Sequence, residues 1–143
     1  MFEHATNTLQ KGSIGMARAI YEYQTLGYTV LIPLVDAQDY DLVIEKDGEF
    51  QSVQCKTTNQ KAKSRKGGYL DRYEVSLRTI KTNTKKTVFR KRGKYDLLFV
   101  MCGNGDCYSI PASILPKSGT SVGGPKYKQY KLGGYPNGEE AGC

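Results

Sequence analysis

The chain has no tryptophan, and it has one histidine, His4, in 143 residues. His4 lies in an N-terminal stretch without apolar periodicity, so catalysis by an imidazole is not expected. No apolar run is long enough to cross a bilayer, and the first residues lack the apolar core of a secretory signal. The sequence therefore predicts a cytoplasmic, intracellular protein that has no membrane partner.

Cysteine is also sparse, with four residues, of which only Cys102 and Cys107 are closely spaced. The intervening segment, Gly103–Asp106, has the composition of a tight turn. A zinc site would need two further ligands, which the spacing does not offer. We therefore expect Cys102 and Cys107 to be neighbours in a hairpin or by chance.

A chain of this length forms one domain with a single core. Residues 1–143 are treated as one unit, with a core of about residues 9–116. Residues 117–143, rich in glycine, lysine and tyrosine, are expected to form a C-terminal extension. Its lysine and tyrosine residues at 126–131 could contact nucleic acid or a neighbouring subunit, and a flexible tail is an equal alternative.

The net charge of +7 is unevenly distributed. Residues 61–94 contain 13 lysine and arginine residues and two acidic residues, a net charge of +11, which leaves −4 for the rest of the chain. A basic block in an otherwise acidic domain indicates a polyanionic partner, and nucleic acid fits best. A merely solvated loop surface is the alternative.

Apolar residues at helical spacing predict a helix from about Leu9 to Leu26, which ends at Gly27. Gly12 and Gly15 near its start each disfavour a helix by about 1 kcal/mol relative to alanine, so close approach to a strand, a DNA backbone or a second subunit is one explanation for them. A frayed first turn is the other.

The rest of the chain is predicted to be mainly strands, giving an α/β fold with a mixed central sheet on which the N-terminal helix packs. Residues 59–68 and 78–94 are expected to be basic loops or surfaces. The expected strands are 28–35, 42–45, 50–58, 69–77, 95–102 and 107–110, and a short helix is expected at 111–115.

The strongest local signal is the pair Asp47-Gly48 between two apolar runs, which predicts a β-hairpin. In its second strand Gln54 and Lys56 are two residues apart and share one face. Antiparallel pairing brings Asp41, at the start of the first strand, towards them. A carboxylate, an amide and an amine are therefore expected in one patch.

This arrangement of Asp41, Gln54 and Lys56 resembles the signature of the PD-(D/E)xK nuclease superfamily, with glutamine in place of the usual second acid. The chain is most similar to the branch of group I intron-encoded and phage homing endonucleases, and more distantly to archaeal Holliday-junction resolvases. The resemblance covers residues 10–58 well and 95–116 weakly. Its further motifs are Gly12-x-x-Gly15, Gly27–Val30, Pro33 and Gln54–Thr57.

The resemblance implies a restriction-endonuclease-like core with helices flanking the sheet, a phage, bacterial or organellar host, and a catalytic role for Asp41, Gln54 and Lys56. It also implies Mg²⁺, for which Mn²⁺ can substitute, bound by Asp41, Gln54 and the backbone carbonyl of Cys55, with no organic cofactor. Lys56 would orient the attacking water. Asp39, close to Asp41 in sequence, is a weaker candidate for a second carboxylate.

Met16 departs from the pattern of this branch, in which an acid usually follows the second glycine. A thioether is a poor ligand for Mg²⁺, which prefers hard oxygen donors. Glu22 is six residues further along the helix, about 240° around it, and cannot take the same position. Water or a substrate phosphate then completes the site, or the chain is an inactivated form, natural or engineered.

Basic residues of the 61–94 block are the candidate contacts to DNA. Arginine matches the O6 and N7 atoms of guanine, so Arg65, Arg72 and Arg78 are the first candidates to read bases. The full set is Lys61, Lys63, Arg65, Lys66, Arg72, Arg78, Lys81, Lys85, Lys86, Arg90, Lys91 and Arg92.

These observations together predict a Mg²⁺-dependent, site-specific endonuclease that acts on double-stranded DNA. Because a chain this short covers little duplex, a two-strand cut predicts a homodimer or a homotetramer. Two alternatives stay open. One is a structure-specific nuclease similar to Holliday-junction resolvases, and the other is a catalytically impaired DNA-binding protein on a nuclease fold.

Overall fold

The structure is a computed structural model that describes residues 2–4, 7–35, 38–81, 86–89 and 95–133. For the strands within residues 78–89 only the backbone is described. The elements in chain order are α1 (Thr8–Thr25), β1 (Thr29–Leu31), β2 (Leu42–Lys46), β3 (Glu49–Thr58), β4 (Lys61–Lys63), β5 (Tyr69–Ser76), β6 (Arg78–Lys81), β7 (Lys86–Phe89), β8 (Leu97–Cys102), β9 (Cys107–Pro111), η1 (Ala112–Ile114), β10 (Gly119–Val122), η2 (Pro125–Tyr130) and β11 (Lys131–Leu132).

Helix α1 confirms the predicted N-terminal helix to within one residue at each end. Its N-cap is Asn7, whose side chain accepts a hydrogen bond from the Gln10 backbone N–H at 2.9 Å. It ends before Gly27, which has φ +89°, a conformation that favours glycine. Within the described ranges, no helix combines the length and the apolar character that crossing a membrane requires.

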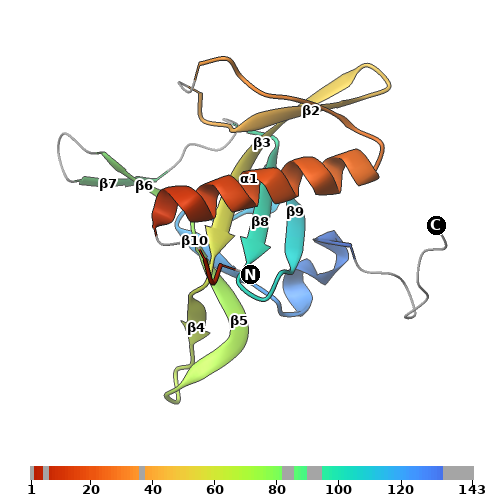
Figure 1. The fold of residues 1–143 in the computed structure, drawn as a ribbon. Helices are drawn as coiled ribbons and strands as arrows, with labels where there is room; N and C mark the ends of the chain where they lie inside the picture. Colours follow the sequence, from red (N-terminus) through yellow and green to blue (C-terminus); the bar gives the residue numbers. More distant parts are fainter. Residues whose placement is uncertain (1, 5–6, 36–37, 82–85, 90–94, 134–143) are drawn as a thin grey trace.

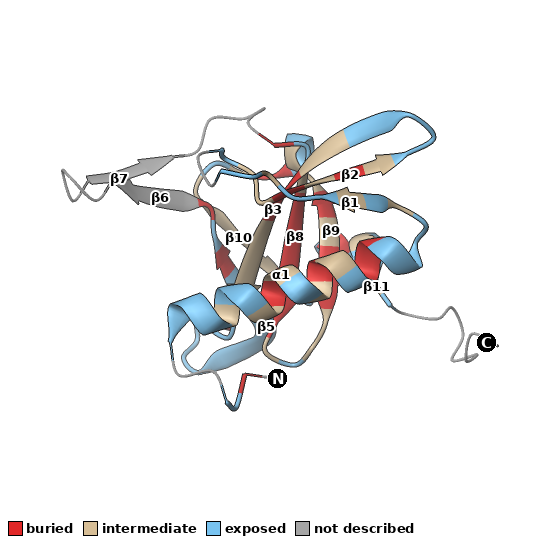
Figure 2. Cartoon of the chain, turned by 45° about the horizontal axis from the view of Figure 1, so that its top comes forward, coloured by how far each residue is buried: buried red, intermediate tan, exposed pale blue. Residues whose placement is uncertain are grey.

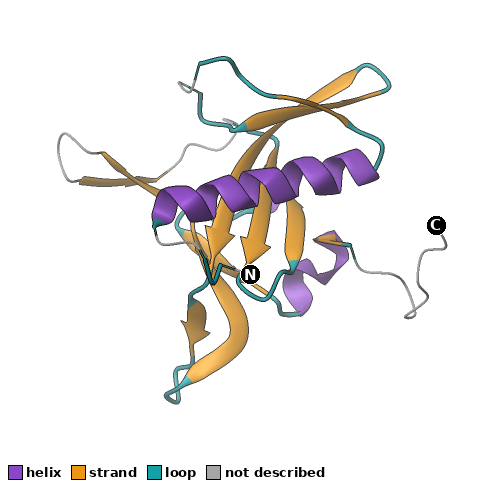
Figure 3. Ribbon diagram, viewed as in Figure 1, coloured by secondary structure: helices purple, strands orange, loops and turns teal. Residues whose placement is uncertain are grey.

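The central sheet has six strands in the order β1-β2-β3-β8-β9-β11. Strands β3 and β8 are parallel, and the other neighbouring pairs are antiparallel, so the predicted mixed sheet is confirmed. Helix α1 crosses one face of the sheet, as Figures 1 and 3 show. This face and α1 enclose an apolar cluster that includes Ala19, Tyr23, Leu42, Val53 and Phe99, called here the helix-side cluster.

Close contact between α1 and β3 depends on Gly15. A Cβ atom at this position would overlap with Cγ2 of Thr57 in β3. At Gly12 an added Cβ would meet no atom within 4 Å. Close approach to a strand is therefore confirmed for Gly15, whereas no described atom of the chain approaches Gly12.

The opposite face of the central sheet is covered by a three-stranded sheet, in the order β10-β5-β4, and by η2. Apolar residues of β8 and β9, such as Val100 and Ile110, pack here against Tyr73 and Val75 of β5 and Tyr127 of η2. Strand β8 is therefore buried along both faces, which explains its continuous apolar sequence (Figure 2).

The packed fold extends past residue 116, to Leu132. Strand β10 pairs with β5, β11 pairs with β9 in the central sheet, and Tyr127 is 1% exposed. For residues 119–132 the alternative of a flexible tail is therefore wrong. Residues 134–143 lie outside the described residues.

Three local predictions need correction. The first strand is only Thr29–Leu31, because its pairing with β2 ends at Leu31 and Pro33 has no N–H to donate. The expected loop 59–68 contains β4, which pairs with β5. The short helix after β9 is the 3-10 helix Ala112–Ile114, and Pro111 belongs to β9 rather than to its first turn.

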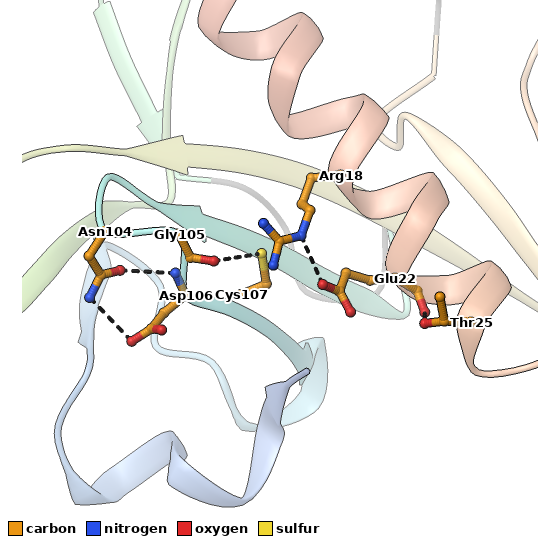
Figure 4. A network of polar contacts seen from close by, with 7 residues as sticks. All are labelled: Arg18, Glu22, Thr25, Asn104, Gly105, Asp106 and Cys107. Atoms are coloured by element: carbon orange, nitrogen blue, oxygen red, sulfur yellow. Dashed lines mark hydrogen bonds and ion pairs between the residues drawn. The ribbon is translucent and has the colours of Figure 1, made fainter. Parts of the chain in front are cut away.

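Polar contacts lie along the second half of α1 and in the neighbouring β8–β9 turn. The Arg18 guanidinium donates to Oε1 of Glu22 at 2.8 Å, and Glu22 is buried. Figure 4 shows this pair beside the β8–β9 turn, where the Asp106 N–H donates to the Asn104 side chain. Glu22 is thus engaged in an ion pair with Arg18.

Candidate active site

The β2–β3 hairpin positions the candidate site. Asp47 has φ 54° and Gly48 has φ 82°, so both turn residues adopt the left-handed conformation that a two-residue hairpin turn requires. The pairing of Leu42 with Val53 then sets Asp41 opposite Gln54. The Asp41 backbone N–H also donates to the Val53 carbonyl at 2.8 Å, one residue out of this register, and so holds the start of the hairpin against β3.

The carboxylate of Asp41 binds the strand that carries the other candidate residues. Its Oδ2 atom accepts hydrogen bonds from the Cys55 backbone N–H at 2.7 Å and from Nε2 of Gln54 at 2.9 Å. Strand β3 continues beyond the end of β2, so at Cys55 the carboxylate replaces the missing strand partner. The side chain of Asp41 is therefore held in one orientation by the backbone it faces.

Gln54 is 8% exposed, and its Nε2 atom also lies 3.4 Å from the Cys55 carbonyl oxygen. The structure thus brings together a carboxylate, an amide and a backbone carbonyl from Asp41, Gln54 and Cys55. In the present arrangement the side-chain NH2 group of Gln54 points at Oδ2 of Asp41 and at the carbonyl oxygen of Cys55. A turn of the amide would direct its oxygen to the same place.

These three oxygen donors fit a small hard cation such as Mg²⁺, which binds carboxylate and carbonyl oxygens. The donor set carries a single negative charge, that of Asp41. Among the described residues no group of three or more histidine, cysteine or acidic side chains is placed to hold a metal ion. A cation here would bind neutral oxygens together with the single carboxylate of Asp41.

Lys56 follows two residues after Gln54 on the same face of β3, while Val53 and Cys55 face α1. It is half-buried, and it lines a cleft of about 890 Å³ between the end of β3 and the β10-β5-β4 sheet. The side chains of Gln54 and Lys56, and this cleft, therefore lie on the side of the central sheet away from α1, whereas the Asp41 carboxylate lies at the edge of β3, where it accepts the Cys55 backbone N–H.

The Cys55 side chain points towards α1 and packs against the helix-side cluster. Burial, and to a lesser extent the negative charge of Asp41, raises the pKa of its thiol far above the ordinary value. The thiol therefore stays protonated at neutral pH and is not a nucleophile. Only the backbone of Cys55 takes part in the site.

Met16 and Asp39 differ in their surroundings. Met16 is half-buried and packs against the helix-side cluster, which Cys55 also contacts, so it contributes to packing. Asp39 is exposed, two residues before Asp41.

The candidate DNA-contacting residues on β4 and β5 lie on a ribbon that projects from the body of the molecule (Figure 1). Lys63, Arg65 and Lys66 are exposed on it. Lys61 is engaged within the ribbon, since its Nζ lies 2.9 Å from Oδ1 of Asp71 and 4.8 Å from the Tyr73 ring centroid.

Arg72 lies against the chain that precedes η2, where a Cβ atom at Gly124 would come within 3.0 Å of the Arg72 Nε atom. Arg78, Lys81 and Lys86 belong to the β6–β7 hairpin, whose backbone alone is described. Lys85, Arg90, Lys91 and Arg92 lie outside the described residues.

Asp96 is a positioning residue that the sequence analysis missed. Its Oδ2 atom accepts from the Ser52 backbone N–H at 2.9 Å, and its own N–H donates to the Ser52 carbonyl at 3.0 Å. These bonds stabilise the register of β3 against the parallel strand β8, two residues before Gln54. The one sequence signal was a carboxylate directly before the apolar run of β8.

Comparison with known proteins identifies a family and a solved structure with a similar fold. A family model described as PD-(D/E)XK endonuclease matches residues 6–125. No curated protein sequence matches the chain. Among solved structures the fold is similar to that of a bacterial homing endonuclease, I-Ssp6803I, with a TM-score of 0.71, 24% sequence identity, and coverage of 87% of this chain and 88% of that chain. At this identity the structural likeness establishes the fold.

Proposed function

Because the chain belongs to the PD-(D/E)XK endonuclease family, we propose that it is a Mg²⁺-dependent endonuclease of the homing type, which hydrolyses double-stranded DNA at a specific site. The proposal depends on one observation: Asp41, Gln54 and the Cys55 carbonyl lie together in the structure. Lys56 directly follows Cys55 on the same strand. Endonucleases of this family generally depend on a divalent metal ion.

Hydrolysis of a phosphodiester needs an oriented water, neutralisation of the charge that grows on the phosphoryl oxygens, and stabilisation of the departing 3′ oxygen. Lys56 supplies a positively charged side chain at the site. Its ammonium group orients the attacking water and stabilises the negative charge of the transition state. Its half-buried position strengthens this interaction, because nearby protein replaces water.

Asp41, the side-chain oxygen of Gln54 and the carbonyl of Cys55 would hold Mg²⁺, and Mn²⁺ would fit the same oxygens. When bound, the ion supplies a Lewis acid and lowers the pKa of coordinated water. With glutamine in place of an acid, the donor set has one negative charge fewer than in relatives with two acids. We therefore expect weak binding of Mg²⁺ that becomes tighter when DNA phosphate is present.

A cut through both strands needs two such sites, so we propose a homodimer or a homotetramer. Apolar residues exposed along and after the edge strand β1, including Leu31, Ile32, Leu34 and Val35, support association between copies. Sedimentation of the free protein is expected to give a dimer or tetramer, and the Leu34→Ser variant should shift it towards monomer. A monomeric parent would contradict this proposal.

The second candidate function is DNA binding without cleavage, and Met16 is the observation that favours it. Position 16 has no acid, and the carboxylate of Asp41 is the one that contacts the Cys55 backbone in the part of the chain that the structure describes. The remaining candidate, a nuclease specific for four-way junctions, has the same site and differs in its substrate.

The test compares the parent with Asp41→Asn and Lys56→Gln on plasmid DNA and on a four-way junction, with Mg²⁺ or Mn²⁺ and with EDTA. Each substitution is expected to slow cleavage by about 100- to 1,000-fold, as loss of a transition-state contact does. Both variants should still bind duplex DNA, and EDTA should abolish cleavage by the parent.

Three outcomes separate the candidates. Cutting by both variants at the parental rate would show that the hairpin is not the active site. Cleavage of the junction alone would favour the structure-specific nuclease. Binding of duplex by the parent without cleavage in either metal would leave a DNA-binding protein.

A further inference from the structure

Beside the hairpin site lies the cleft that Lys56 lines, between the end of β3 and the sheet β10-β5-β4. Its lining is polar, since six of its fifteen residues are serine or threonine and three are apolar. Lys56, Lys63 and Lys126 contribute three positive charges, and Glu74 contributes one negative charge. Hydroxyl groups and a net charge of +2 fit an anionic ligand rather than an apolar one.

Lys126 forms the wall contributed by the C-terminal segment. Its place in η2 is fixed by its neighbour Tyr127, which is 1% exposed and whose hydroxyl lies 2.9 Å from Oγ1 of Thr120. Pro125 begins the 3-10 helix, and β11 after it pairs with β9. Lys126 thus projects from an anchored element and not from a loose tail.

The ammonium group of Lys126 lies 5.2 Å from the Tyr127 ring centroid. Among the described carboxylates, none forms an ion pair with it, whereas Lys61 pairs with Asp71 and Lys131 with Asp106. Binding of a phosphate by Lys126 therefore does not require an ion pair with a described carboxylate to break.

We propose that this cleft binds the backbone of the DNA strand that is cut, with Lys126 holding a phosphate next to the one attacked beside Lys56. The inference rests on the proposed nuclease function, and it assigns to η2 a contact with the DNA substrate. The hydroxyl groups of Ser121 on β10 and of Ser118, directly before this strand, are additional donors to the same backbone. The C-terminal segment is therefore part of the DNA-binding surface.

The test measures binding of a mixed-sequence DNA duplex in EDTA over a series of salt concentrations, for the parent, Lys126→Gln and Lys128→Gln. Lys128 is the matched control, because it is exposed on the same 3-10 helix, about 240° around it, and does not line the cleft. Both lysines are exposed, so neither substitution should change the midpoint of thermal unfolding.

Lys126→Gln is expected to weaken binding about tenfold, the value of one charge-assisted hydrogen bond. It should also reduce the slope of log K against log salt concentration by about 0.9, the value for one phosphate contact. Lys128→Gln should change the affinity less than about twofold. A purely structural role for Lys126 would leave the salt slope unchanged.

An unchanged slope for Lys126→Gln, or an equal loss for Lys128→Gln, would overturn the assignment of the cleft. Cleavage by the parent is measured in parallel with Mg²⁺. If the parent cuts DNA while Lys126→Gln binds as it does, the cleft inference fails and the proposed function stands. If the parent neither binds nor cuts DNA, both fail.

Discussion

At the scale of single residues, Asp41 has two roles that support each other. Its Oδ2 atom replaces a strand partner for the Cys55 N–H, and the same contact sets the carboxylate beside Gln54. A carboxylate that accepts a backbone N–H is held without loss of its charge. The site is thus built on strand backbone, which is more rigid than a loop.

Met16 is the residue at which a single substitution is expected to add to the site. In Met16→Glu the new carboxylate is half-buried, so the free energy of unfolding should fall by about 1–3 kcal/mol without metal. Added Mg²⁺ should recover part of this loss and should raise the rate of DNA cleavage. Thermal unfolding with and without Mg²⁺ and plasmid cleavage measure both effects.

The neutral control is Met16→Gln, which has nearly the same shape as Met16→Glu. It should show neither the recovery by Mg²⁺ nor the faster cleavage. If the two variants respond alike to Mg²⁺, position 16 is not part of a metal site.

At the scale of elements, the fold depends on how closely α1 approaches β3. Gly15 allows this approach, because any side chain there would meet Cγ2 of Thr57. Since β3 carries Gln54 and Lys56 on its other face, a displaced helix would disturb the strand that bears the site. The contact thus links helix packing to the geometry of the hairpin.

The variant Gly15→Ala is expected to lower the free energy of unfolding by about 1–3 kcal/mol through overpacking. Gly12→Ala is the matched control and should raise it by up to about 1 kcal/mol, since alanine favours the helix and its Cβ meets no atom within 4 Å. Urea unfolding measures both.

Thr57→Ser removes the methyl group that an alanine at position 15 would meet. The double variant Gly15→Ala/Thr57→Ser should therefore recover part of the loss of Gly15→Ala. If it were no more stable than Gly15→Ala with Thr57 intact, the overlap at Thr57 would not be the cause.

At the scale of the whole molecule, the central sheet separates two apolar layers, and the two neighbouring cysteines illustrate this. Cys102 packs with β5 and η2, whereas Cys107 packs on the side of α1. Both are free thiols, and they face opposite sides of the sheet, so they cannot bind one metal ion. They lie on the paired strands β8 and β9, so the prediction that they are neighbours in a hairpin is confirmed.

Burial of the Cys102 and Cys107 thiols makes the stability of the fold sensitive to alkaline pH. Burial raises the pKa of Cys107 from 9.0 to about 11, and burial, with a smaller contribution from Asp106, raises that of Cys102 to about 12. Above pH 9 the unfolded chain loses these protons while the folded chain keeps them. The free energy of unfolding should therefore fall as the pH rises from 9 to 11.

Urea unfolding under reducing conditions over this pH range measures the effect. Cys107→Ala lowers stability at every pH through the cavity it leaves, but it should show a shallower decline with pH than the parent. An equally steep decline in this variant would exclude Cys107 as a source of the pH dependence.

The sequence by itself determined the elements whose signals are local. The left-handed turn at Asp47 and Gly48, the alternation along β3 and the helix that ends at Gly27 follow from backbone conformation and periodicity over a few residues. Because a hairpin has a fixed register, these signals also placed Asp41 opposite Gln54. Whether these residues are catalytic stays a prediction for the cleavage experiments.

Only the tertiary structure decided which distant segments meet. The parallel pairing of β3 with β8, the closure of β10 on β5 and the anchoring of Tyr127 join parts of the chain that no local pattern connects. Lys126 therefore looked like part of a tail, although it lies in the same cleft as Lys56. Such contacts depend on packing of the complete fold, because burial of Tyr127 requires the surfaces of β5, β8 and β9 to be in place.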